Sequence, residues 1–582
     1  MTKTLTNIIF CTALSSLYCC NYLKANGSGF GLNDTIPTFE YREIYLPEAA
    51  SGKEGHALGL NSIDDDWGLW GHNLSHVLPE TPSQTIYAKH GDEIMHEQYC
   101  FTSDRLFEYL EEYIQDRYGE NKTVRFAILP NDNEIVCTCK GCTDAGNTKL
   151  DASPAVLQMI TRLAKRFPSH LFFTSYYQTT RSVPTDSLPQ NTGVLISTMD
   201  YPLSAVGTTQ EDDFAELLLA WSRKTEHVYI WDYINNFDDY FTPFPVFEAM
   251  QRRFQLYAGA GVRGIFLNGS GTDYSTMSRL KLHVIAALMK NPEIDWRPIL
   301  ESLCHEFYPV AGDAISQFML AQEDYVVNQA KTLPLYEGVA KAVDTYLPEA
   351  EFTAFHDSLQ ALLPKTESGE REDIDKMYKA LMLTRLELMR LHSDMDNSQS
   401  MLAQLSDLSK YNIDVYNESA WTIEEYIKDY TYMSRHAEEI KKENLLQGVA
   451  LTALTPLDPD YTNISILTDG MLGLPSNYHC GQLISSADPA LRIAIPPVAG
   501  MKRLRVCLTR NPLYHIALPL KVTLTAGDSK VATVEPHPAA DHSGHSFVEF
   551  NVPTSYTGTL VVTLLRNPDE RTMAIEEIEG LR

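Results

Sequence analysis

Short, nearly continuous apolar runs alternate with longer amphipathic stretches between residues 38 and 295. Runs such as 124–129 and 171–177 are too short for helices, and their composition predicts strands that are buried on both faces of a parallel sheet. Further strands are expected at residues 39–45, 67–71, 99–101, 194–198, 228–234 and 262–267. The intervening segments, 104–117 for example, carry apolar residues at helical spacing.

Eight strands with helices between them, in about 260 residues, predict a (β/α)8 TIM barrel over residues 38–295. A doubly wound open sheet is the alternative, but its Gly-rich dinucleotide turn does not follow the first strand. The class is therefore α/β, and the barrel is the favoured architecture.

The pattern changes twice after the barrel. From residue 296 to 447 the strand signal stops and long helical patterns take over, which predicts a helical subdomain. Residues 451–582 alternate apolar and polar positions, with Pro, Gly and Asp between the runs. That alternation predicts a C-terminal antiparallel β-sandwich.

The first 25 residues have the features of a secretory signal peptide. Lys3 provides a positive start, and residues 8–18 form an apolar core that is too short for a comfortable membrane span. No later run reaches the length of a transmembrane helix. We expect a mature chain that is secreted, periplasmic or attached to the cell surface, with no transmembrane segment.

The charge of the chain excludes one class of partner. With 47 Lys and Arg against 76 Asp and Glu, the formal net charge is −29. A protein that binds nucleic acid needs a basic face to neutralise phosphates, and no Lys/Arg cluster supplies one here. Nothing in the sequence indicates an oligomeric state.

Function in a TIM barrel belongs at the carboxyl ends of the strands, and these ends carry aromatic, amide, His and carboxylate side chains. Tryptophan and tyrosine rings stack on the C–H faces of sugars, while carboxylates, amides and His bind their hydroxyls. The mixture predicts a carbohydrate substrate. The side chains expected to bind it are Trp70, His72, His76, Tyr176, Tyr177, Asp200, Trp231, Tyr233 and Asn268.

Hydrolysis of a glycosidic bond needs two carboxyl groups, one of which protonates the leaving oxygen. Asp132 and Asp232 follow or end predicted strands, and we expect Asp132 to donate the proton and Asp232 to act as base or nucleophile. Glu134 and Asp200 are the substitutes. A single Asp after a strand is also a common helix cap or turn residue.

Arg42 is the predicted clamp for a uronate carboxylate, because its guanidinium fork matches that group. His72 and His76 lie four residues apart, but no H-E-x-x-H motif accompanies them, so hydrogen bonding to substrate is favoured over a catalytic metal. No cofactor is expected for catalysis.

Four cysteines form one set. Cys100 is followed by Cys137, Cys139 and Cys142, which are spaced C-x-C-x-x-C. Close-spaced thiols with a fourth nearby suit a structural zinc ion, and two disulfides fit an exported protein equally well.

Several ordered motifs resemble one known family. They are residues 39–42, 72–76, 98–100, 130–132 with the cysteine motif, 231–233, 257–266 and 291–295. Together they resemble the family known as domain of unknown function 4838. The resemblance implies a glycoside-hydrolase-like barrel allied to α-glucuronidases, in exported glycan-utilisation systems. The tail, with residues 467–470 opening the sandwich, is similar to discoidin-type (coagulation factor 5/8 C-terminal) carbohydrate-binding modules.

Relatives often place a Glu after the eighth strand, where this chain has Leu267 and Asn268. If that Glu takes part in catalysis, this protein binds glycan without cutting it. Two functions are therefore open: an exported glycoside hydrolase, or a non-catalytic glycan-binding or surface scaffold protein.

Overall fold

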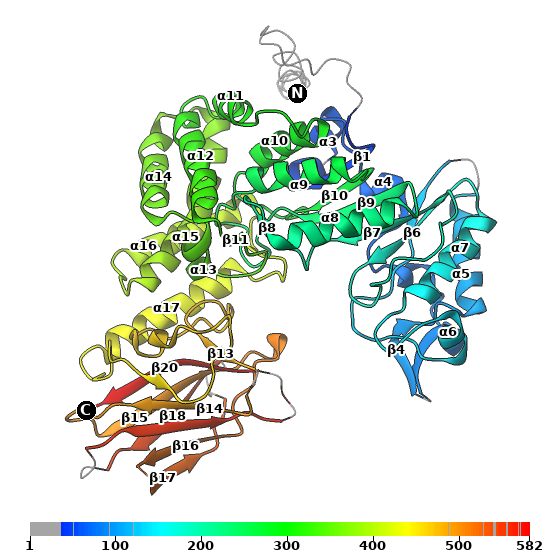
Figure 1. Ribbon diagram of the computed structural model, residues 1–582. Helices are drawn as coiled ribbons and strands as arrows, with labels where there is room; N and C mark the ends of the chain where they lie inside the picture. The colour runs from blue at the N-terminus through cyan, green and yellow to red at the C-terminus, as the bar shows by residue number, and fades with distance from the viewer. Residues whose placement is uncertain are drawn as a thin grey trace, which may run out of the picture. The chain divides into compact units, whose positions relative to one another are not determined.

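The computed structural model describes residues 37–582, except 51, 92, 120–121, 487, 528, 539–542, 554–556, 569 and 571. The predicted signal peptide, residues 1–25, lies outside the described residues. The described chain forms two compact units (Figure 1). The first unit comprises residues 37–236 and 244–335, and the second unit comprises residues 237–243 and 336–582.

A parallel sheet of seven strands forms the centre of the first unit. In spatial order the strands are β1 (Tyr41–Tyr45), β10 (Gly264–Asn268), β9 (His227–Tyr233), β7 (Thr192–Ser197), β6 (Leu171–Tyr176), β5 (Arg125–Ala127) and β2 (Trp67–Leu69). Within the described residues, β1 and β2 are the two edges and form no ladder with each other. The mixed α/β class is confirmed, but the sheet has seven strands and is open, where the sequence predicted eight in a closed barrel.

The missing strand is the one predicted at residues 99–101. The chain there ends β4 (Glu93–Tyr99), which pairs antiparallel with β3 (Tyr87–His90) in a separate hairpin. Most of β4 is exposed or half-exposed and polar. A strand inside a parallel sheet is covered by other elements on both faces, so this sequence is not suited to that position.

The seven-stranded sheet is curled, as contacts between side chains of its two edge strands show. Tyr41 of β1 and Trp67 of β2 contact edge to face, with ring centroids 6.0 Å apart. Both belong to one buried cluster that also contains Phe173, Tyr229 and Phe266 from the strands between them. We call the side of the sheet that carries this cluster the interior face.

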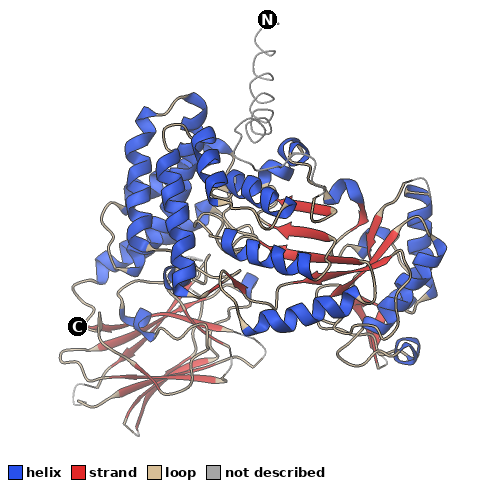
Figure 2. Cartoon of the chain, turned by 45° about the horizontal axis from the view of Figure 1, so that its top comes forward, coloured by secondary structure: helices blue, strands red, loops and turns tan. Residues whose placement is uncertain are grey.

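Helices cover the other side of the sheet (Figure 2). The main ones are α5 (Asp104–Arg117), α7 (Ser153–Arg166), α8 (Thr209–Ser222), α9 (Phe247–Gly259) and α10 (Ser278–Lys290). The next two helices, α11 (Arg297–Phe307) and α12 (Gly312–Gln329), pack against each other and against α10 and α9. The first unit also has four shorter helices, α2 (Pro47–Ala50), α3 (Lys53–Ala57), α4 (Ile63–Asp66) and α6 (Lys140–Ala145). Ile63 of α4 packs in the interior cluster. Local sequence determines the helix starts: Ser103 caps α5 by accepting from the N–H of Leu106 at 3.3 Å, and Pro154 lies in the first turn of α7.

The second unit begins with helices and ends with two antiparallel sheets. The helices are α13 (Val339–Thr345), α14 (Glu349–Leu362), α15 (Ser368–Leu391), α16 (Ser398–Ser406) and α17 (Ile423–Ile440). The five-stranded sheet contains β12 (Thr452–Ala453), β14 (Ala490–Ile495), β19 (Leu560–Leu565), β16 (Lys521–Ala526) and β17 (Ser529–Val534). The four-stranded sheet contains β13 (Leu483–Ser485), β20 (Met573–Leu581), β15 (Arg503–Thr509) and β18 (His545–Asn551).

Buried residues of both sheets, such as Ile493 and Val522 from one and Val506 and Ile578 from the other, share a single apolar core. The sheets therefore pack face to face as a sandwich. In the part of the chain that the structure describes, no helix is long and apolar enough to cross a membrane.

Candidate functional site

The carboxyl ends of the parallel strands bring several predicted residues together on the interior face. Strand register places Tyr45, Asn268 and Tyr233 in one row across β1, β10 and β9. One step deeper, Glu43, Phe266 and Trp231 form the next row. Alternation of side chains puts both rows on the same face as the buried cluster of Tyr41, Tyr229 and Phe266. We call this end of the interior face the mouth.

A small apolar cavity of about 10 Å³, room for about one water molecule, lies among the interior side chains at the mouth. It is lined by Ile63, Trp67, Trp70, Ala127, Leu195, Trp231 and Phe266. Trp70 and Trp231 are only half-buried, and the Trp231 ring lies 4.1 Å from the ring of Phe266, centroid to centroid. The cavity therefore has aromatic walls that are still partly open to solvent.

The loop after β5 presents Asp132 to solvent. The side-chain amides of its neighbours, Asn131 and Asn133, both donate to the carbonyl of Glu97, at 2.8 and 2.9 Å. Gln98 Nε2 donates to the Asn131 carbonyl at 3.1 Å and to Asn133 Oδ1 at 3.0 Å. Asp132 lies between these two anchors and is exposed. The loop is thus tied to the end of β4 while its carboxylate stays free of the anchoring bonds.

Asp132 is close enough to the interior tyrosines to affect them. Burial raises the pKa of Tyr177 above its usual value, and the Asp132 and Asp200 carboxylates raise it further. Burial also raises the pKa of Tyr233, with Asp132 again contributing. His72 joins the same region, since its Nδ1 donates to the carbonyl of Pro130 at 2.5 Å. Asp132, Tyr177, Tyr233 and His72 therefore lie in one neighbourhood.

Asp232 does not lie at the mouth, which corrects the predicted carboxylate pair. It is fully buried, receives the guanidinium of Arg253 and the hydroxyl of Tyr257 from α9, the latter at 2.5 Å, and accepts from Thr198 Oγ1 at 2.7 Å. Because Trp231 and Tyr233 point to the interior, Asp232 between them points to the helices. A carboxylate held in this way is not placed to act on a substrate at the mouth.

Arg42 and Tyr176 point away from the interior for the same reason. Arg42 Nη2 donates to the carbonyl of Gly59 at 2.7 Å, and this guanidinium does not form the predicted carboxylate clamp at the mouth. The ring of Tyr176 contacts Trp221 of α8 edge on, with centroids 6.4 Å apart. Arg42 was predicted at the mouth although its neighbours Tyr41 and Glu43 face the interior, and of the two tyrosines predicted there, Tyr176 and Tyr177, Tyr176 faces the helices.

The remaining predicted residues, Asp200, Glu134 and His76, lie outside the strands of the sheet. Asp200 is exposed and pairs with Arg181, at 2.6 Å between Nη2 and Oδ2. Glu134 is exposed two residues beyond Asp132. His76 is exposed in the short helix η1 (Leu74–Val77). None of the three is fixed in the row of interior side chains.

Glu43 is a carboxyl group that sequence reasoning missed. It lies on the interior face of β1, is 4% exposed, accepts from the N–H of Ile63 at 2.7 Å and receives the hydroxyl of Tyr41. Burial raises its pKa to about 7, against the opposing effect of these two hydrogen bonds. The sequence did contain an indication of this site. Glu43 lies in a strand predicted to be buried, and a carboxyl group is seldom fully buried without a specific partner or role.

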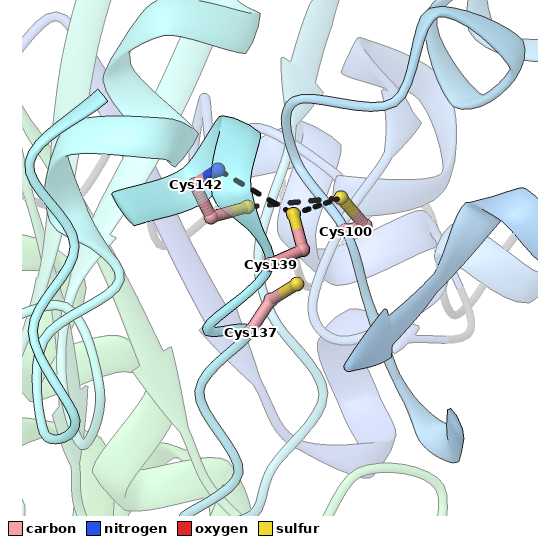
Figure 3. Close-up of side chains that lie close together, drawn as sticks. All are labelled: Cys100, Cys137, Cys139 and Cys142. Carbon is pink, nitrogen blue, oxygen red and sulfur yellow. Dashed lines mark hydrogen bonds between the residues drawn. The ribbon is translucent and has the colours of Figure 1, made fainter. Parts of the chain in front are cut away.

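The four predicted cysteines come together at one place in the first unit (Figure 3). Cys100 follows β4, Cys137 and Cys139 precede α6, and Cys142 lies within α6. All seven cysteines in the described part of the chain have free thiols. Cys304, Cys480 and Cys507 are buried elsewhere.

Residues 73–320 match the family described as "Domain of unknown function (DUF4838)". The family predicted from the motifs is therefore confirmed for this segment of the chain. No curated protein matches the chain.

Solved structures with some similarity include carbohydrate-active proteins. A family GH115 4-O-methyl-α-glucuronidase with specificity for decorated arabinogalactans has 10% identity and a TM-score of 0.34, over 86% of this chain and 69% of that one. A GH138 enzyme targeting pectin rhamnogalacturonan II has 9% identity and a TM-score of 0.31, over 94% of this chain and 85% of that one. The lectin domain of lectinolysin, in complex with Lewis B antigen, has 12% identity and a TM-score of 0.20, over 24% of this chain and 97% of that one.

Proposed function

We propose that the protein is exported, binds a poly- or oligosaccharide at the mouth of the curled sheet, and hydrolyses one of its glycosidic bonds. One observation carries this proposal: the cavity lined by Trp70 and Trp231 shares the interior face with Glu43, and Asp132 lies beside the same mouth. Pockets with aromatic walls and a few convergent polar groups are typical of ligand sites.

The aromatic side chains would hold the apolar face of a sugar ring. Trp70 and Trp231 are half-buried, so a sugar ring that packs against their exposed faces displaces water from the indoles. Tyr45, Tyr233 and Asn268, in the row above Trp231, supply hydroxyl and amide groups for the sugar hydroxyls. A uronate-containing glycan fits less well than expected, because Arg42 faces away from the mouth.

The reaction needs one protonated and one ionised carboxyl group. Glu43 is the proposed proton donor, because a pKa of about 7 keeps it protonated in a useful fraction at neutral pH. Asp132, exposed on the loop after β5, is the proposed base or nucleophile. This exchanges the role first assigned to Asp132 and replaces Asp232, whose carboxylate is held by Arg253.

A glycan-binding protein without hydrolytic activity is the second candidate. It is favoured by the fact that both oxygens of Glu43 already accept hydrogen bonds, from Tyr41 and Ile63. Asn268 at the mouth, where the resemblance to relatives places a Glu, points the same way. In this case the sandwich of the second unit would serve as an additional carbohydrate-binding module.

The two candidates are separated by measuring products and retention on the same glycans. The full chain is incubated with a panel of polysaccharides, with and without uronate, and new reducing ends are counted. Asp132→Asn should abolish product formation and leave retention in affinity gels nearly unchanged, whereas Glu134→Gln, the exposed matched control, should behave as wild type. Unchanged turnover in Asp132→Asn rejects the assignment. Retention of the wild-type chain without any product establishes the second candidate.

A further inference from the structure

We propose that Cys100, Cys137, Cys139 and Cys142 bind one Zn²⁺ ion, which clamps the loop carrying Asp132 to the β3–β4 hairpin. The four side chains point toward one another (Figure 3), and their Sγ atoms all lie within 4.8 Å of each other. Cys100 Sγ lies 3.6 Å from Cys139 Sγ and 3.7 Å from Cys142 Sγ. Four thiolates about 2.3 Å from a tetrahedral zinc ion lie roughly 3.8 Å apart, which is the spacing found for these pairs.

The contacts of Cys100 favour a metal centre over disulfides. A disulfide joins one sulfur to a single partner at about 2.05 Å, and the partner is then closer than any other thiol. Cys100 is instead nearly equidistant from two thiols. One thiol with several equal neighbours is expected around a shared central ion.

The backbone around the cluster is arranged to stabilise thiolates. The N–H of Lys89, in β3, donates to Cys137 Sγ at 3.3 Å. The N–H of Cys142 donates to Cys139 Sγ at 3.5 Å, and the hydroxyl of Thr102 lies 3.2 Å from Cys142 Sγ. Hydrogen bonds to coordinating groups orient them and adjust their affinity for the metal. These bonds come from both chain segments that the ion would join.

The position of the cluster explains what the ion would do. Cys137 follows Asp132 by five residues, and Cys100 follows Gln98, which holds the Asn131 carbonyl and the Asn133 side chain. The clamp and these hydrogen bonds therefore fasten the same two segments together. Zinc is placed as a structural element, and this inference stands whether or not the mouth hydrolyses glycans.

Metal analysis of the full chain, purified without reductant or chelator, tests the proposal. We expect one zinc per chain, with every thiol reactive to Ellman's reagent after unfolding in EDTA. Cys139→Ser should lose most of the metal, because serine keeps the capping position of α6 but is a poor zinc ligand. Cys304→Ser, a buried cysteine outside the cluster, is the matched control and should keep all of it. Three outcomes would each overturn the proposal. The chain could contain no zinc and four unreactive thiols, it could contain no zinc while all thiols react, or Cys139→Ser could keep as much zinc as wild type.

Two further measurements do not depend on how well a variant folds. Replacing the ion in the wild-type chain with Co²⁺ should produce the intense visible bands of a tetrahedral tetrathiolate site, and weak octahedral bands would contradict the assignment. Removing the metal should increase hydrogen exchange at residues 129–142 while β14 and β19 in the sandwich stay unchanged. Unchanged exchange at residues 129–142 would refute the clamp.

Discussion

Replacing Asp232 by Asn distinguishes a structural carboxylate from a catalytic one. Asp232 is fully buried and pairs with Arg253, which is 8% exposed. The substitution leaves the guanidinium of Arg253 in the interior with the Tyr201 carbonyl, at 2.8 Å, and an amide in place of its counter-ion. Removing one partner of a buried ion pair costs about 3–5 kcal/mol of unfolding free energy, because the other charge stays buried without compensation. We expect a loss of that size in Asp232→Asn.

The control is an ion pair of the same type at the surface. Asp200 and Arg181 pair at 2.6 Å, but their side chains are 47% and 42% exposed. Exposed pairs contribute about 0–1 kcal/mol, so Asp200→Asn should change the unfolding free energy of the first unit by less than about 1 kcal/mol. The structure thus predicts at least a threefold difference between two chemically identical substitutions.

Urea unfolding followed by hydrogen exchange of the β9 and α9 amides measures the first unit separately from the second. Asp232→Asn should lower the protection of these amides against hydrogen exchange. The variant molecules that remain folded should still bind the glycan that retains the wild-type chain. The reasoning fails if Asp232→Asn is as stable as wild type within about 1 kcal/mol and has lost turnover, because the carboxylate would then act in the reaction.

Two further predictions concern the mouth. Glu43 has a pKa of about 7 in the folded chain and an ordinary value near 4.3 when unfolded, so the folded state binds an extra proton between these values. The free energy of unfolding therefore falls as pH rises through this range, by roughly 3–4 kcal/mol in total. Glu43→Gln should remove the part of this stability loss that comes from Glu43. The part due to Glu323, whose burial also raises its pKa to about 7, should remain. Urea titrations between pH 4 and 8 in which variant and wild type lose stability in parallel would contradict the prediction. Trp70→Ala should weaken glycan binding by about tenfold or more, roughly 1.4 kcal/mol. Tyr176→Ala, on the side that faces the helices, should bind the glycan as wild type does in affinity gels. Equal losses of binding in the two variants would place the glycan elsewhere.

Much of the first unit could be predicted from local pattern. The strands at 124–129, 171–177 and 228–234 overlap β5, β6 and β9, because short apolar runs between helical segments have few other ways to bury themselves. The hairpin strand β4 was misplaced because Tyr99, its last residue, and Cys100, which follows it, are buried and apolar, whereas Glu93–Glu97 are exposed or half-exposed. The pairing of β4 with β3 depends on the exposure of the whole strand, and a stretch of three residues in the sequence does not reveal it.

The candidate site was predicted unevenly. The cysteine set needed only spacing, since a C-x-C-x-x-C segment brings three thiols within a few ångströms and requires only one distant partner. Strand register places Trp231 and Asn268 at the mouth, whereas Asp232, between Trp231 and Tyr233, faces the helices and pairs with Arg253.

The amino-acid sequence by itself determined the family of the segment, most of the strands and helices of the first unit, and which four thiols meet. Only the tertiary structure decided whether the sheet closes and which face each strand residue occupies. In a strand buried on both sides, both faces are apolar, so the alternation that separates interior from exterior in a half-exposed strand is not visible in the composition. A carboxylate in such a strand faces the side on which a cation or hydrogen-bond donor compensates its burial. For Asp232 this partner is Arg253, which lies twenty-one residues further along the chain, on the helix side.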